Sequence, residues 1–341
     1  MIESAWISSN DYKKILNKEF YQFNSIYYQT IWHELLKKSF KIQVKYIKTF
    51  CENGSVICLT PVFIKRKFIF TLIGSPLSGL NTIYTGPIFI KSLTSTHQKE
   101  AFSSVNKLLF KLRPSYIEIG MRNSIYLSSD FESFVKNQNY KYTKYPTLQI
   151  CLENSEEIIW KSFQSRARNM IRKSQNKQIY VNEVEIDLKW LENYYEMLKI
   201  TFHKQNLEVP HPKIFYLNLM KINNGYLKGF TAFLENKEVA HAIFLVDDRQ
   251  FLFLSGTANL EGLKFAAPSQ IQWSAIKKAK QLGMKIYDFG GIGIKKIDKF
   301  KMSFNGKQSH YHRWTYMAFP FLIIYKLAFF LNRLKIIKIK I

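Results

Sequence analysis

The chain has 341 residues, of which 47% are hydrophobic and 16% aromatic, so a large core is expected and a globally disordered chain is excluded. Its 50 Lys and Arg residues against 25 Asp and Glu give a formal net charge of +25. A charge of this size favours an anionic partner, such as nucleic acid, anionic lipid or a phosphorylated substrate, although a lysine-rich proteome explains it equally well.

The first half of the chain mixes helix and strand patterns. Asn53 and Gly54 form a strong hairpin turn between two strand patterns. In chain order we predict two helices, three strands, a Gly-, Pro- and Ser-rich segment, a helix and a strand, over residues 12–19, 29–39, 42–50, 55–64, 68–73, 74–87, 95–112 and 116–120.

A basic segment, residues 160–178, follows, with no acidic residue between Glu157 and Glu183. Arg168 and Arg172 are four residues apart and share one face of a helix. Two interpretations remain open: a solvated basic helix, or a helix that faces the phosphate groups of a substrate. The basic residues of the segment are Lys161, Arg166, Arg168, Arg172, Lys173 and Lys177.

The second half has a clearer order of elements. Asp187 is a plausible helix cap and Gly283 a helix end. We predict a strand, two helices, three antiparallel strands, a helix and a strand, over residues 179–184, 188–203, 212–223, 226–234, 238–246, 251–257, 268–282 and 285–289. This order is that of the GNAT acyltransferase fold, and the first half repeats it loosely. Two tandem copies of one fold are therefore expected, joined near residues 150–160.

The last predicted strand ends in a glycine turn, residues 287–293, and a lysine, Lys301, follows within an apolar frame. Glycine allows a backbone to approach a ligand closely, and a lysine beside such a turn can meet an anion. The segment contains Asp-Phe-Gly, but the other kinase motifs are missing. The glycine spacing also differs from that of a dinucleotide-binding fingerprint.

These motifs, in this order, resemble those of FemAB-like proteins and related GNAT acyltransferases of envelope-polysaccharide systems. The amino-terminal half agrees more weakly, through Trp32, Pro61, residues 74–76 and residues 86–87. The resemblance covers most of residues 1–310, and its main motifs are residues 165–174, 255–257, 268–276, Gly283, residues 287–291, 299–301 and Phe304.

The resemblance implies an α/β (α+β) fold of tandem GNAT-like domains, with mixed, mostly antiparallel sheets flanked by helices. We place the amino-terminal domain at residues 1–155 and the carboxyl-terminal domain at 156–316. Residues 317–341 form an apolar, basic tail. From Thr315 onward this tail has five basic residues and no acidic one. Two readings stay open for it: peripheral contact with an anionic membrane leaflet, or a terminal helix docked on the core.

The resemblance also implies the site. Lys301 is the candidate for electrostatic work, on an oxyanion or on a phosphate of the donor. Asp288 either holds a backbone turn or accepts a proton from the acceptor amine, and the turn is favoured. Trp273 is on its own best explained as a core residue. We assign substrate contacts to Arg168, Arg172, Lys173, Gly290, Gly291, Phe300, Gln272 and Trp273.

The implied activity is transfer of an acyl or aminoacyl group to an amine of a cell-envelope precursor, of peptidoglycan or polysaccharide. Acyl-CoA or aminoacyl-tRNA would be the co-substrate, with no tightly bound cofactor. Residues 258–268 lack the Gly-rich, basic loop that holds a pyrophosphate, which makes coenzyme A doubtful and favours charged tRNA. The alternatives are an acyl-CoA-dependent acetyltransferase of polysaccharide or lipid, and a non-catalytic protein that binds an anionic glycolipid or RNA.

The remaining sequence signals bear on location and metals. Cys51, Cys58 and Cys151 are odd in number and lack metal-site spacing, which fits free thiols in a reducing cytosol. His310 and His312 lack an evident third ligand, so no metal is expected. The amino terminus shows no signal-peptide pattern. We therefore expect a cytoplasmic protein, associated with the inner face of the membrane if the tail contacts lipid.

Overall fold

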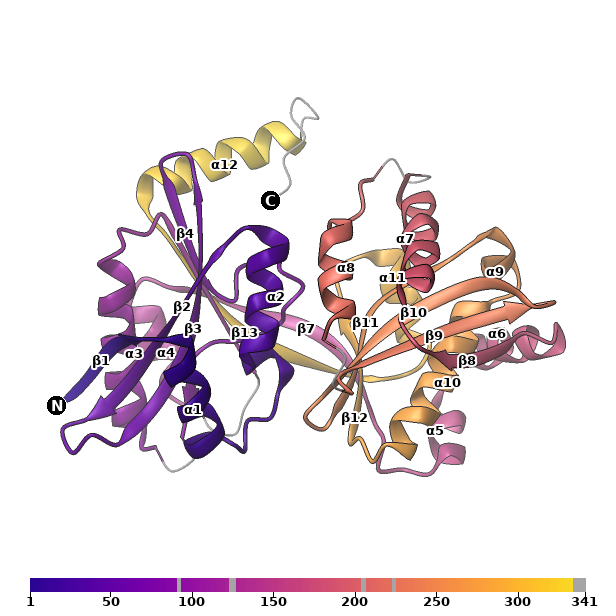
Figure 1. Cartoon of the computed structure of the whole chain (residues 1–341), viewed down its shortest axis with the longest axis horizontal. Coiled ribbons are helices and arrows are strands. Elements are labelled where there is room, and N and C mark those ends of the chain that lie inside the picture. The colour runs from indigo at the N-terminus through magenta and orange to yellow at the C-terminus, as the bar shows by residue number, and fades with distance from the viewer. Residues whose placement is uncertain (91–92, 123–126, 204–206, 223–224, 334–341) are drawn as a thin grey trace. The chain divides into compact units, whose positions relative to one another are not determined.

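The computed structural model describes residues 1–90, 93–122, 127–203, 207–222 and 225–333, and these form two compact units (Figure 1). The first unit contains residues 1–23, 27–144 and those from Tyr311 onward, and the second contains residues 24–26 and 145–310. The predicted domain boundaries, at 155/156 and 316/317, lie later in the chain than these changes of unit. The boundaries differ because residues 141–151 form a strand that pairs within the second unit, and residues 307–317 form a strand that pairs within the first.

The first unit is built on one mixed sheet. Its strands lie in the order β1-β2-β3-β4-β6-β13, and every neighbouring pair is antiparallel except β4 and β6, which are parallel. A short strand, β5 (Ile88–Phe89), pairs with β3. The bounds are β1 Ile2–Ile7, β2 Gln43–Cys51, β3 Val56–Lys67, β4 Phe70–Ser75, β6 Tyr116–Met121 and β13 Lys307–Met317.

Five α-helices of the described residues belong to this unit. Thr94 caps α3 through its side chain, which accepts from the amide of His97. The last helix, α12, follows β13 directly. No helix of the described residues combines the length and apolar character needed to cross a membrane. The helices are α1 Ser9–Glu19, α2 Thr30–Phe40, α3 Ser95–Phe110, α4 Phe131–Asn137 and α12 Phe319–Arg333, and the 3-10 turn η1 (Ile26–Tyr28) lies at a change of unit.

The second unit repeats the same sheet pattern. Its strands lie in the order β8-β9-β10-β11-β12-β7, with only β11 and β12 parallel. The fold of two similar mixed sheets flanked by helices is the one expected from the sequence. The bounds are β7 Lys141–Cys151, β8 Tyr180–Val184, β9 Leu227–Leu234, β10 Lys237–Asp247, β11 Gln250–Ala258 and β12 Ile286–Gly291.

The helices of the second unit include the predicted ones. The carboxylate of Asp187 accepts from the amide of Trp190 at 2.7 Å, which confirms the predicted cap of α7. Gly283 has φ +72° just after α10, as expected of a helix end. The bounds are α5 Glu156–Ser162, α6 Ser165–Asn176, α7 Leu188–His203, α8 Lys213–Met220, α9 Leu260–Lys264, α10 Ala267–Gln281 and α11 Lys295–Met302.

The strand that closes each sheet comes from the other half of the sequence. β7 follows α4 of the first unit but pairs with β12, and β13 follows α11 of the second unit but pairs with β6. The apolar side chains of these strands enter the matching cores: Leu148 and Ile150 that of the second unit, and Trp314 that of the first. Burial of these side chains holds the exchanged strands in place.

Candidate functional site

The parallel strands β11 and β12 stay paired over only three residues, from Gln250 opposite Ile286 to Leu252 opposite Asp288. Directly after this pairing β11 carries a bulge, because its register with β10 shifts around Leu254. A bulge bends a strand and increases its twist, so it can lead β11 away from its neighbour. The residues of β11 are buried up to Leu252, half-buried over residues 253–255 and exposed at Gly256. This accessible stretch begins where the pairing with β12 ends.

The glycine turn at the end of β12 contains two glycines that pack closely against other residues of the chain. Gly290 has φ +73°, a conformation that favours glycine. A Cβ at Gly290 would lie 3.2 Å from the carbonyl oxygen of Phe253, and one at Gly291 would lie 2.9 Å from the hydroxyl of Tyr145. Close protein neighbours therefore account for both glycines. Ligand contact at Gly290 and Gly291 stays a prediction.

Asp288 lies fully buried on β12 and is surrounded by donors. Its carboxylate accepts from the hydroxyl of Thr147 at 2.5 Å, from the side-chain amide of Gln149 at 2.7 Å and from the backbone amide of Gly290 at 2.7 Å. These three donors come from β7 and from the glycine turn, so they fix the position of the carboxylate. The geometry favours the turn-holding alternative for Asp288: it fixes the glycine turn and ties β12 to β7.

Lys301 reaches back from α11 to the same turn. Its side chain is only 7% exposed, and its Nζ donates to the carbonyl of Gly291 at 2.8 Å. Burial lowers the pKa of this amine below its usual 10.5, while the carboxylates of Asp288 and Asp298 oppose the shift. Asp298 in turn accepts from the amide of Gly293 at 3.1 Å. The contact with Gly291 uses one of the three donors of an ammonium group, so Lys301 has the capacity to meet a second acceptor.

The basic helix α6 starts beside α11. The amide of Gln164, its cap residue, donates to the carbonyl of Ser303 at 2.9 Å. Arg168 is turned inward: its guanidinium donates to the carbonyls of Lys161, at 3.1 Å, and Phe163. Arg172 lies over the ring of Trp160 at 5.7 Å, and Lys173 is exposed. Arg172 and Lys173 are therefore more accessible to an anion than Arg168.

The other predicted contact residues lie in or against the second core. Gln272 is 2% exposed and accepts from the hydroxyl of Tyr287 at 2.5 Å. Trp273, which is 8% exposed, packs edge-on against Phe163 at a centroid distance of 5.5 Å. Phe300 is half-buried and packs against that core. These contacts give Gln272 and Trp273 a packing role that does not require a ligand.

Sequence reasoning missed a layer of hydroxyl groups between α7 and β11. The hydroxyl of Tyr194 donates to Ser255 at 2.6 Å, and the hydroxyls of Thr201 and Thr257 lie 3.0 Å apart. The signal was present, since residues 255 and 257 share one face of a strand and residues 194 and 201 share one face of a helix. This layer fixes the orientation of the accessible part of β11.

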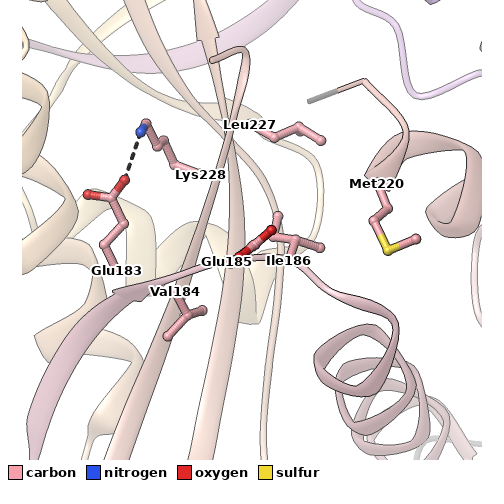
Figure 2. A pocket seen from close by; sticks show the side chains of 7 residues that line it. All are labelled: Glu183, Val184, Glu185, Ile186, Met220, Leu227 and Lys228. Atoms are coloured by element: carbon pink, nitrogen blue, oxygen red, sulfur yellow. Dashed lines mark ion pairs between the residues drawn. The ribbon is translucent and has the colours of Figure 1, made fainter. Parts of the chain in front are cut away.

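A cavity of about 420 Å³ lies elsewhere in the second unit (Figure 2). Glu183 at its wall pairs with Lys228 at 2.7 Å and with Lys278 at 2.6 Å. Burial raises the pKa of the Glu183 carboxyl, but the two lysines outweigh it and the pKa is lowered overall. None of the predicted site residues lines the cavity, so we base the site on the end of β12. The lining residues are Glu183, Val184, Glu185, Ile186, Met220, Leu227 and Lys228.

Across the described ranges, no three His, Cys, Asp or Glu side chains come together in a way that could hold a metal ion. His312 instead shares a hydrogen bond of 2.8 Å with the hydroxyl of Tyr142.

Residues 224–312 match the FemAB family model, and this range contains β12, the glycine turn and Lys301. This part of the chain thus resembles the FemAB family, and the whole chain has the fold of tandem GNAT proteins. No curated protein matches the sequence.

Solved structures resemble this chain over nearly its whole length. The crystal structure of FemX superposes with a TM-score of 0.71 at 14% identity, covering 95% of this chain and 99% of that one. The carboxyl-terminal domain of a putative lysylphosphatidylglycerol synthetase from Agrobacterium fabrum gives 0.58 at 8% identity, covering 95% and 98%. A tandem GNAT protein of the clavulanic acid biosynthesis pathway gives 0.58 at 6% identity, covering 93% and 98%. At these identities the likeness establishes the fold.

Proposed function

We propose that the FemAB-like chain transfers an aminoacyl group from a charged tRNA to an amine of a cell-envelope precursor. The observation that carries the proposal is Lys301, a buried ammonium group bonded to the carbonyl of Gly291 where β12 ends and within the FemAB match. Anionic charge develops on the carbonyl oxygen during acyl transfer, and a fixed donor in a water-poor site stabilises it.

The reaction is an aminolysis of an ester. The neutral amine attacks the ester carbonyl, a C–N bond forms, and negative charge appears on the carbonyl oxygen. The C–O bond to the ribose then breaks, and the ribose oxygen takes up the proton that the amine loses. We assign Lys301 to the oxyanion or to a donor phosphate, and Asp288 to positioning the turn. No residue is assigned as the general base.

The loop between β11 and α10 supports tRNA over coenzyme A. Acyl-CoA binding in the usual mode needs backbone amides that point at a pyrophosphate. Here the amide of Gly262 donates to the side chain of Asn259 at 2.8 Å, and a Cβ at Gly262 would lie 2.2 Å from the carbonyl of Val239. The amides of Leu263, Phe265 and Ala266, in α9 and at its end, also donate to carbonyls of the same segment. The formal charge of +25 and the exposed Arg172 and Lys173 suit a polyanionic donor.

The test is a transfer assay with two donors and one acceptor. Purified protein receives either aminoacyl-tRNA or acetyl-CoA, with a peptidoglycan precursor whose stem peptide has a free lysine amine. We expect product from aminoacyl-tRNA, and a loss of about 10²-fold or more in kcat for Lys301→Met, as is typical when one oxyanion donor is removed.

Lys299→Met is the matched control, because Lys299 is exposed on the same helix. Circular dichroism must show that both variants fold. Wild-type activity in a folded Lys301→Met variant contradicts the assigned role. Product only from acetyl-CoA indicates an acyl-CoA-dependent enzyme. Binding of tRNA that weakens steeply with salt, without product from either donor, indicates a non-catalytic binding protein.

A further inference from the structure

Two segments of the first unit that are far apart in sequence contact each other, and each exposes large apolar side chains. One is the turn between β3 and β4, where Phe68 is 91% exposed and Ile69 is 87% exposed. The other is α12, where Phe319, Ile323 and Leu327 are 74%, 52% and 56% exposed. Figure 1 shows the β3–β4 hairpin beside the start of α12. We name the two segments together the hairpin–helix surface.

Aromatic contacts hold the two segments together. The ring of Phe321 on α12 packs edge-on against Phe70 of β4 at a centroid distance of 5.1 Å and lies 6.0 Å from the ring of Tyr116. Successive helix residues are about 100° apart, so Phe319, Ile323 and Leu327 occupy a sector roughly opposite to Phe321. The inner face of α12 therefore docks on the sheet, while the outer face is left apolar and accessible.

The turn itself has an unusual sequence for its geometry. Lys67 pairs with Phe70, which leaves a two-residue loop of Phe68 and Ile69. Phe68 has φ +53°, and loops of this length favour glycine, asparagine or aspartate at such a position. An aromatic residue there has an unfavourable backbone conformation and no burial in return. This cost is explained if the turn inserts into an apolar environment outside the chain.

The charged residues within these two segments all have one sign. Lys65, Arg66 and Lys67 precede the turn and are all exposed, and Lys326 is exposed on α12. The sequence has no acidic residue after Asp298. Exposed apolar side chains surrounded by lysine and arginine are typical of segments that insert into the interface of an anionic bilayer.

We propose that the hairpin–helix surface docks on an anionic lipid bilayer. Phe68, Ile69 and the outer face of α12 enter the interface, and the basic side chains meet the lipid phosphates. The 15 residues of α12 span about 22 Å, less than the hydrocarbon core of about 30 Å, so the helix lies in the interface rather than across it. This proposal adds the hairpin to the tail expected from the sequence and does not depend on the acyl-transfer activity.

The test is sedimentation of the 341-residue chain with phosphatidylcholine vesicles, with and without phosphatidylglycerol. We expect binding that requires phosphatidylglycerol. The double variants Phe68→Ser/Ile69→Ser and Ile323→Ser/Leu327→Ser should each weaken it by about tenfold or more, because each removes two inserting side chains. The matched control is Leu188→Ser/Ile200→Ser on α7, whose residues are 52% and 54% exposed and lie outside the surface. It should stay within about twofold of wild type.

Two triple variants that each remove three positive charges distinguish the effect of charge at the surface from the effect of the overall net charge. Lys65→Gln/Arg66→Gln/Lys67→Gln should weaken binding more than Lys13→Gln/Lys14→Gln/Lys18→Gln, which removes the same charge from the exposed side of α1. Three outcomes overturn the proposal: no preference for phosphatidylglycerol, equal losses in the control variants, or a dimer by light scattering that the hairpin variant dissociates without any change in vesicle binding. The last outcome would identify the surface as a contact between copies.

Discussion

At the scale of single residues, the candidate site contains two buried charged side chains that have different partners. Asp288 is surrounded by donors from Thr147, Gln149 and Gly290, so its charge is compensated within the fold. Lys301 has one backbone carbonyl, that of Gly291, and burial disfavours its charged form. A buried charge with few hydrogen-bond partners destabilises the folded state. A role for Lys301 in acyl transfer would explain why the fold keeps it there.

The pH dependence of stability tests this difference. The pKa of Lys301 is lowered in the folded protein, so between that value and its ordinary 10.5 the unfolded chain binds more protons than the folded one. Stability conferred by Lys301 therefore rises with pH across this window, and is poorest below it, where the buried amine is charged. We expect the free energy of unfolding of Lys301→Met, minus that of wild type, to fall from pH 7 to pH 10.

Urea unfolding at both pH values measures this difference in the free energy of unfolding. The contributions of all other titratable groups cancel, because both proteins contain them. Lys299→Met, on the exposed side of α11, should show no such trend. A difference that stays constant or grows with pH would contradict a lowered pKa for Lys301.

At the scale of elements, β7 and β13 have the same role in the two sheets: each supplies a side-chain partner for a buried carboxylate on the neighbouring strand. Glu118 on β6 is 1% exposed and occupies the place in the first sheet that Asp288 has in the second, two residues before a glycine. It accepts from the amide and the hydroxyl of Ser78, each at 2.8 Å, and pairs with Arg313 of β13 at 3.0 Å. In each sheet a buried carboxylate thus bonds a side chain of the strand supplied by the other half of the sequence.

Removal of Arg313 should destabilise the first unit strongly. Arg313→Met leaves the carboxylate of Glu118 buried without its cation, which costs about 3 kcal/mol or more. The double variant Glu118→Gln/Arg313→Met removes the uncompensated charge and should recover part of this loss. Denaturant unfolding measures both, with Lys307→Met, exposed on the same strand, as the control. A loss no larger than that of the control would show that β13 is held by its apolar side chains alone.

At the scale of the whole molecule, each unit contains one deeply buried histidine. His33 is fully buried, and its Nε2 donates to the carbonyl of Tyr27 at 2.9 Å, which leaves Nδ1 as an acceptor 3.2 Å from the hydroxyl of Tyr46. His241 is 1% exposed, and its Nδ1 lies 3.1 Å from the hydroxyl of Thr231. Burial lowers the pKa of both imidazoles from 6.5 to about 4. Both units therefore require these side chains to be neutral.

Mild acid should weaken both units for this reason. Between pH 6.5 and about 4 the two imidazoles bind protons in the unfolded chain but stay neutral in the folded chain. The free energy of unfolding therefore falls as the pH is lowered through this range. Each histidine accounts for roughly 3 kcal/mol of that loss. His33→Gln and His241→Gln should each flatten the pH dependence of unfolding, measured by urea denaturation from pH 7 to pH 4.

His97→Gln provides the control, because His97 is exposed at the start of α3. An unchanged slope in both buried-histidine variants would mean that carboxylates alone set the acid sensitivity of the protein.

Elements with strong local signals were predictable from the sequence. α7 has the predicted bounds, Leu188–His203, because a capping Asp187 and a periodic apolar face define it locally. The predicted hairpin turn at Asn53 and Gly54 is present, with Gly54 at φ +81°. By contrast, the strands β1, β7 and β13 were not predicted. β7 contains Pro146 and both β7 and β13 are rich in polar residues, so their strand character depends on partners far away in the chain.

The candidate site divides in the same way. The order of the glycine turn and Lys301, and the resemblance to FemAB-like proteins, could be read from the sequence because those residues are close together in the chain. The tertiary structure alone decided that Asp288 anchors the turn, because its partners Thr147 and Gln149 lie 141 and 139 residues away. It alone joined Phe68 to α12 in one surface. Local propensity and spacing are properties of neighbouring residues, whereas burial and long-range pairing arise only when distant segments pack together.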